Sequence, residues 1–247
     1  MHCRERQAKA LDDLVDKPKR IDSGSVASDF KSLWSLYHLV PNEGYVSYRI
    51  ELCSARGSEL LLRRLLEKEV RDLWNLFRTT DEKFGTLRGI RYEAYAHKKI
   101  LADGINGTAR LLTKTAISST TTKPIVIPAG SMQVDLPDNN LDSLSRYVDT
   151  KSTQGMYLLP SLCNFPVIDS AYVGPPDLRI MFQMKTGKSK PLSENVSKIC
   201  DALGNFFVVV VPSDNVIRRK LDGGPASLEQ YVLVLNETTY IHAGKQV

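Results

Sequence analysis

A run of six apolar residues, FFVVVV from Phe206 to Val211, constrains the fold of this chain more than any other feature. Its four valines are β-branched and Pro212 follows directly, which indicates a strand that ends there. A strand that is apolar on both faces has to be covered on both sides. Helices packed over a mixed sheet supply that cover, so the run predicts an α/β layered fold.

The segments around this run alternate in the way such a fold requires. RYEAYAHKKILAD, Arg91 to Asp103, is predicted to be a helix ended by Gly104, and SENVSKICDALG a second helix with Ser193 as its cap. Between and after them we expect strands, because the segments are β-branched and broken by Gly and Pro: ARLLTKTAI, KPIVIPA, MQVDL, QGMYLLPS and QYVLVLN. We therefore expect one α/β domain over residues 83–247.

The upstream part, residues 1–82, is predicted to be a helical segment. SELLLRRLLEKEVRDLWNLFR carries apolar residues at helical spacing and charged residues on the other face, which predicts one amphipathic helix of about five turns. A weaker helix is expected from Asp29 to about Val40, ended by Pro41. Both are interpreted as packing elements.

Composition narrows the possible classes of protein. The chain has 247 residues and a net charge of +5, a mild basic excess that permits a polyanionic partner without requiring one. Its four cysteines form no C-x-x-C pair, which argues against a thiolate metal site and a dense disulfide framework. No apolar run approaches the roughly 20 residues that span a bilayer, and no signal peptide is visible, so we expect no membrane contact.

NFPVIDSAYVGPPDLRIMFQMKTGKSK reads as a buried hairpin that nevertheless carries polar residues. With GPPD as its turn, Val173 is expected opposite Leu178 and Asp169 opposite Phe182, next to Gln183. Gln183 and Lys185 share one face of their strand because side-chain direction repeats every two residues. Buried polar groups cost free energy unless they are paired or used, so these three side chains need a reason.

Metal-assisted hydrolysis is one such reason. A carboxylate and an amide oxygen can hold a hard divalent cation, and an ammonium beside them can position a water and balance charge on a phosphate. Each residue also has an ordinary interpretation: Asp169 as a turn cap, Gln183 as a buried hydrogen-bonding side chain, and Lys185 as a surface lysine.

The spacing resembles a known superfamily. An Asp followed fourteen residues later by Gln-x-Lys, and then by a helix and a strand, is similar to the PD-(D/E)xK restriction-endonuclease-like superfamily in its Gln-x-Lys variant. In that superfamily an upstream helix often contributes a glutamate, and Glu93 in RYEAYAH matches that position. This chain departs from the usual pattern, with Ile168 where a proline is common and the neutral Gln183 where an acid is common.

A narrower resemblance covers about Gly85 to Leu235. GIRYEAYAHKKIL, YLLPSLCNFPVIDSAYVGPP and IMFQMK resemble the nuclease-like C-terminal domain of Crinkler and retrotransposon-hot-spot type effectors. The resemblance implies a restriction-endonuclease-like mixed sheet and a metal-dependent nuclease. It implies Mg²⁺ or Mn²⁺ held by Asp169, Gln183 and Glu93, with Lys185 assisting the water. It further implies DNA as the substrate, the host nucleus as the location, and residues 1–82 as the tail of an ATPase-like domain.

Other interpretations remain open. Lys188 and Lys190 would extend a basic surface beside the site where phosphates of a nucleic acid dock, or they are solvated loop lysines. His97, one turn after Glu93, is interpreted as a helix partner of that glutamate. The alternative to a nuclease is a non-catalytic effector domain that binds a host nuclear protein or nucleic acid with a degenerate site. A third is an ATPase accessory that uses residues 1–82 as a partner surface.

Overall fold

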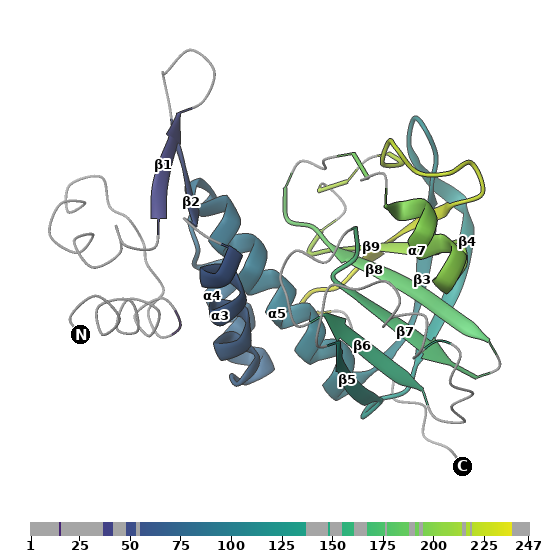
Figure 1. Ribbon diagram of the computed structural model, residues 1–247, viewed down its shortest axis with the longest axis horizontal. Helices are drawn as coiled ribbons and strands as arrows, with labels where there is room; N and C mark the ends of the chain where they lie inside the picture. The colour runs from purple at the N-terminus through teal and green to yellow at the C-terminus, as the bar shows by residue number, and fades with distance from the viewer. Residues whose placement is uncertain are drawn as a thin grey trace, which may run out of the picture. The chain divides into compact units, whose positions relative to one another are not determined.

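The computed structural model describes residues 15, 37–41, 48–52, 55–136, 148, 155–160, 167–175, 177–187, 191–192, 195–213, 216–217 and 219–238. The chain divides into two compact units, Met1–Tyr95 and Ala96–Val247 (Figure 1). The division falls inside the long helix α5, Gly85–Asp103. The predicted boundary after residue 82 precedes that helix and stays a prediction.

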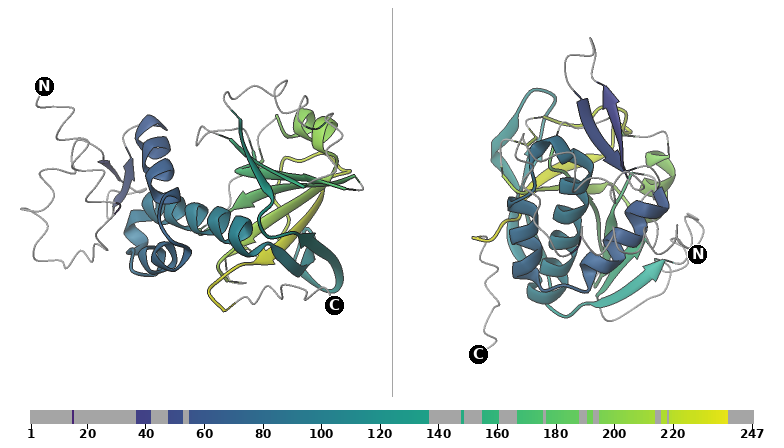
Figure 2. Two further views of the ribbon diagram at one scale, coloured as in Figure 1. Left: turned by 90° about the horizontal axis from the view of Figure 1, so that it is seen from below. Right: turned by 90° about the vertical axis from the view of Figure 1, so that its left-hand side faces the viewer.

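The first unit contains a strand pair followed by helices. Strand β1 (Tyr37–Pro41) pairs antiparallel with β2 (Tyr48–Leu52), and α3 (Ala55–Leu66), α4 (Val70–Arg78) and the short 3₁₀ helix η3 (Glu82–Phe84) follow. The helices of this unit run side by side in Figure 2. The prediction that residues 1–82 are helical is therefore wrong at β1 and β2.

Two helix predictions in this unit need correction. The single helix predicted over residues 58–78 is broken at residues 67–69, where Glu69 has an extended backbone and α4 starts anew. The apolar spacing continues across the break, so periodicity could not detect it. The helix predicted from Asp29 to Val40 is wrong at its end, because residues 37–40 belong to β1. A five-residue strand depends on a pairing partner that no local pattern reveals.

Aromatic rings fill the core of the first unit. Trp74 and Phe77 on α4 pack against Tyr95 and Tyr92 on α5, with ring centroids 4.8 Å and 5.1 Å apart. Arg91 is buried beside them, and its guanidinium donates to Thr80 Oγ1 over 2.7 Å. The amphipathic pattern of the sequence is thus used to bury one face of each helix.

The second unit is built on an eight-stranded mixed sheet of order β4-β3-β10-β9-β8-β7-β6-β5. Parallel pairs are β5–β6, β8–β9 and β9–β10, and the remaining neighbours run antiparallel. The strands are β3 (Ile105–Leu112), β4 (Ile117–Ile127), β5 (Met132–Leu136), β6 (Met156–Pro160), β7 (Ser170–Gly174), β8 (Leu178–Met184), β9 (Phe206–Val211) and β10 (Glu229–Val234). The predicted α/β fold with a mixed sheet is confirmed.

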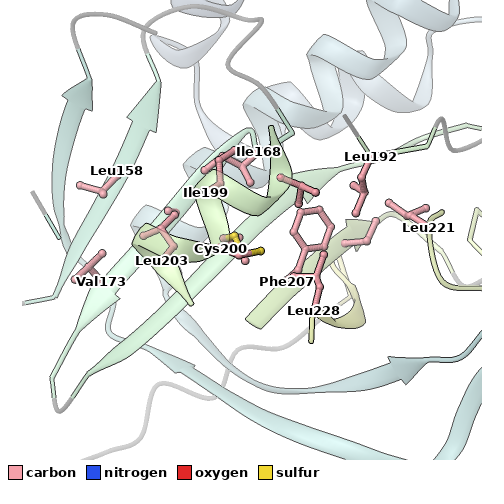
Figure 3. Close-up of a cluster of buried hydrophobic side chains, with 14 of the residues drawn as sticks. Leu158, Ile168, Val173, Leu192, Ile199, Cys200, Leu203, Phe207, Leu221 and Leu228 are labelled. Atoms are coloured by element: carbon pink, nitrogen blue, oxygen red, sulfur yellow. The ribbon is translucent and has the colours of Figure 1, made fainter. Parts of the chain in front are cut away.

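Helices cover both faces of this sheet, as the FFVVVV run required. Helix α7 (Val196–Leu203) connects the parallel strands β8 and β9, and its apolar side contributes to a buried cluster with residues such as Phe207 (Figure 3). On the opposite face, the His97 ring of α5 contacts Tyr157 of β6. Figure 2 shows the C-terminal turns of α5 beside the sheet. All six residues of β9 are buried between these layers.

Helix boundaries were predicted better at their ends than at their starts. Helix α5 begins at Gly85, six residues before the predicted start, and ends before Gly104 as predicted. Gly104 has a φ of 73°, and a Cβ there would collide with the backbone of residues 127–129. The predicted cap Ser193 lies outside the described residues, and Asn195 precedes α7.

In the described part of the chain, no helix combines the length and apolar character needed to cross a membrane.

Candidate functional site

The register of the hairpin differs by one residue from the predicted one. Gly174 pairs with Leu178 and Val173 with Arg179, so the turn takes only residues 175–177. Asp177 makes this tight turn possible with a φ of 85°, a left-handed conformation that Asp tolerates better than most residues. The predicted pairing of Val173 with Leu178 is therefore wrong by one residue. The pairing ends at Ser170, opposite Phe182, and Asp169, which was predicted opposite Phe182, donates its backbone N–H to the Phe182 carbonyl.

The backbone of the Gln-x-Lys segment holds the Asp169 side chain. The backbone N–H of Met184 donates to Asp169 Oδ2 over 2.6 Å, and the backbone N–H of Asp169 donates to the Phe182 carbonyl over 2.8 Å. Met184 is the residue between Gln183 and Lys185. The structure therefore brings the Asp169 carboxylate to the centre of the motif that the sequence singled out.

Gln183 carries a buried oxygen. Its Oε1 has no hydrogen-bond partner among the residues that the structure describes. Leaving a buried amide carbonyl without a partner costs about 1–3 kcal/mol, so this glutamine is not the ordinary satisfied side chain of the alternative interpretation. Strand β10 shows the contrast, because its buried Gln230 makes two hydrogen bonds to the backbone of Leu221.

Lys185 continues the strand beyond its last assigned residue. Its backbone N–H donates to the Val210 carbonyl over 2.9 Å, which extends the pairing of β8 with β9. The alternation of side chains therefore carries on to Lys185, and its half-buried side chain points to the same face as Gln183. Lys188 and Lys190 lie outside the described residues.

The two faces of β8 can be assigned from contacts. Arg179 Nη1 donates to the carbonyl of Ala202 on α7, and Met181 belongs to the cluster with α7, so Gln183 and Lys185 point to the α7 face. Phe182 points to the other face, where its ring lies 6.3 Å from that of Tyr157. His97 contacts Tyr157 on that face.

Glu93 belongs to the first unit, four residues before His97 on α5. Residues four apart lie on the same side of a helix, so Glu93 and His97 lie on one side of α5. Its predicted share in the metal site stays a prediction.

His97 has a hydrogen-bond partner that sequence reasoning missed. Its Nδ1 lies 2.8 Å from the Tyr157 hydroxyl, which lies 2.7 Å from Ser170 Oγ. Burial lowers the pKa of His97 to about 4, and the charge of Asp169 opposes that shift. No local signal in the sequence points to Tyr157 or Ser170, because their contact depends on the register of two strands and the placement of a helix.

The donor set suits a hard cation. Asp169 offers a carboxylate and Gln183 an orphaned carbonyl oxygen, and Mg²⁺ is often held by one or two protein oxygens together with waters and substrate phosphates. Among the described residues no group of three or more His, Cys, Asp or Glu side chains is placed to hold a metal ion.

A cavity of about 600 Å³ lies at the other end of the hairpin, where Tyr172, Pro175 and Leu178 line it together with residues 128–132. Ser170 begins β7, directly after Asp169, while Gly174 ends it, so this cavity and the polar cluster lie at opposite ends of the strand. Of the described residues in the candidate site, none lines this cavity.

Comparisons with family models, with curated proteins and with solved structures find no match for this chain. The resemblance to Crinkler-type effector domains and to the PD-(D/E)xK superfamily therefore stays a prediction from the sequence motifs.

Proposed function

We propose that the second unit is a metal-dependent phosphodiesterase acting on nucleic acid, with DNA as the favoured substrate. One observation carries the proposal: the Asp169 carboxylate is held by the Met184 N–H, between Gln183 and Lys185. The orphaned Gln183 Oε1 supports it, because a second oxygen ligand explains a group that otherwise only destabilises the fold.

Each candidate residue of the second unit has a role in this proposal. Asp169 and Gln183 are proposed to bind Mg²⁺ or Mn²⁺. Glu93, the third oxygen donor predicted from the sequence, belongs to the first unit and takes no part in this proposal. When bound, the ion would act as a Lewis acid that polarises the phosphate and lowers the pKa of the water bound to it. The Lys185 ammonium orients the attacking water and balances the negative charge that builds up on the phosphate. Lys188 and Lys190 are proposed contacts to the nucleic-acid backbone.

The substrate and the location are supported by the sequence resemblance and the charge of the chain rather than by contacts within the site. DNA in a host nucleus is what the resemblance to Crinkler effectors implies, and the mild positive charge of the chain is compatible with it. A partner among host nuclear proteins belongs to the alternative, a binding domain without catalysis.

Cleavage of supercoiled plasmid in Mg²⁺ or Mn²⁺ tests the proposal. The unaltered protein should nick the plasmid, and Lys185→Ala should lower the rate about 100-fold or more, because the charge that assists the water is lost. Asp169→Asn should abolish metal-dependent cleavage.

Lys114→Ala is the matched control. Lys114 is exposed in the turn between β3 and β4, and its replacement removes the same charge away from the hairpin. Equal rates for Lys185→Ala and the unaltered protein would reject the proposed role of Lys185. An intact plasmid with both metals across pH and salt would reject the nuclease and favour the binding domain.

A further inference from the structure

Three buried polar side chains form a hydrogen-bonded row across the α5 face of the sheet. His97 comes from α5, Tyr157 from β6 and Ser170 from β7, and all three are fully buried. His97 Nδ1 lies 2.8 Å from the Tyr157 hydroxyl, and that hydroxyl lies 2.7 Å from Ser170 Oγ. We refer to these residues as the His97–Tyr157–Ser170 row.

The two hydrogen bonds of the row depend on each other. Burial keeps His97 neutral near pH 7, so its ring carries one N–H donor and one acceptor nitrogen. The Tyr157 hydroxyl has a single proton, which it donates either to His97 or to Ser170. Whichever direction it takes, the contacts on the two sides of Tyr157 are linked, and each holds its partner at a defined distance and angle.

The row ends beside the candidate metal ligand. Ser170 follows Asp169 directly and pairs with Phe182, whose carbonyl accepts the N–H of Asp169. Fixing Ser170 therefore fixes the backbone from which the Asp169 side chain reaches the Met184 N–H. The charge of Asp169 is also felt at His97, the other end of the row.

Apolar side chains of similar size would pack this layer without any need for matched hydrogen bonds. Three hydrogen-bonded side chains instead hold one another at defined positions. A metal ligand needs such precise positioning, whereas an apolar core does not.

We propose that the His97–Tyr157–Ser170 row is a positioning device that holds the Asp169 carboxylate in the orientation needed to bind the metal. This inference rests on the proposed function, in which Asp169 is a metal ligand. Tyr157 is the central member, because its hydroxyl makes both contacts of the row. None of the three residues is proposed to touch the substrate.

Tyr157→Phe tests the inference, with Tyr172→Phe as the matched control. Tyr172 pairs directly with Tyr157 across β6 and β7 and is also buried. Its side chain lines the cavity together with Ser131, at the end of β7 away from Asp169. Each variant therefore removes one buried tyrosine hydroxyl, but only Tyr157→Phe breaks the row, because the Tyr157 hydroxyl makes both of its contacts.

Metal affinity separates the two variants. Free Mn²⁺ measured by electron paramagnetic resonance should show a dissociation constant raised about tenfold or more by Tyr157→Phe, and changed by less than about twofold by Tyr172→Phe. In the plasmid assay, Tyr157→Phe should raise the Mn²⁺ concentration for half-maximal cleavage more than it lowers the rate at saturating Mn²⁺. Ser170→Ala breaks the second contact of the row and should weaken Mn²⁺ binding in the same direction.

Two negative results can be told apart. In the first, the unaltered protein binds Mn²⁺ and cleaves in an Asp169-dependent way, but Tyr157→Phe and Ser170→Ala bind Mn²⁺ no more weakly than Tyr172→Phe. This result overturns the positioning role alone. Unaltered protein that neither binds Mn²⁺ nor cleaves overturns the proposed function, and the inference with it.

Discussion

The two faces of the central sheet bury different kinds of contact. On the α7 face, Leu158, Phe207 and Ile199 belong to one apolar cluster (Figure 3). On the α5 face, the same group of strands buries a hydroxyl at Tyr157 and another at Ser170 beside the ring of His97. Apolar contact has no direction and tolerates small shifts, whereas hydrogen bonds fix distance and angle. The comparison teaches that the stability of this sheet and the placement of Asp169 depend on different contacts.

Removing volume from the α7 face should produce the largest loss of stability. Phe207 is fully buried in the cluster, and Phe207→Ala should lower the free energy of unfolding by about 3–5 kcal/mol, through lost transfer energy and the cavity left behind. Urea unfolding followed by circular dichroism measures it. Lys198→Ala, on the exposed side of α7, should change stability by less than about 0.5 kcal/mol. A loss below about 1 kcal/mol for Phe207→Ala would contradict the close packing of this face.

Lowering the pH should reduce the stability of the protein through His97, on the α5 face of the sheet. Its pKa is lowered to about 4 in the folded protein, while the unfolded chain has the ordinary value of 6.5. Between these values the unfolded state binds more protons, so the stability contribution is complete above pH 6.5 and is lost as the pH falls towards 4. The full shift corresponds to about 3 kcal/mol.

His97→Gln isolates this contribution, because the other titrating groups are common to both proteins. The difference in unfolding free energy between the unaltered protein and His97→Gln should shrink as the pH falls from 7 to 4. A difference that stays constant over this range would show that His97 is not held neutral.

Replacing Gln183 or Gln230 should change stability the least, and the two changes should have opposite signs. Gln183 Oε1 has no hydrogen-bond partner in the described part of the chain, whereas Gln230 bonds the backbone of Leu221 through both amide atoms. Gln183→Leu should raise the free energy of unfolding by up to about 1 kcal/mol and weaken Mn²⁺ binding. Gln230→Leu should lower stability, because it strands the Leu221 N–H and carbonyl. Thermal and urea unfolding of both variants tests the opposite signs, and a loss of stability in Gln183→Leu would mean that its oxygen is already satisfied.

Strand and helix types in the second unit were largely predictable, and the contacts between them were not. MQVDL matches β5, FFVVVV matches β9, and the stop at Gly104 is confirmed by its positive φ. The hairpin register was predicted one residue off, because turn length depends on whether Asp177 adopts a left-handed conformation. In the first unit, the break between α3 and α4 was missed because apolar spacing runs through it. Strand β1 was missed because it depends on its pairing with β2.

The candidate site shows the same division. Sequence spacing singled out Asp169, Gln183 and Lys185, and the hydrogen bond from Met184 to Asp169 places the carboxylate at the middle of that motif. Tyr157 and Ser170 could not be found in this way, because their side chains meet only after β6, β7 and α5 are assembled.

By itself, the sequence determined that a six-residue apolar strand would need cover on both sides, and hence a layered α/β unit, because burial of apolar surface follows composition and local order. Only the tertiary structure decided which polar groups meet across that layer. Hydrogen bonds between distant segments depend on register and angle, and a shift of one residue along a strand turns a side chain to the opposite face.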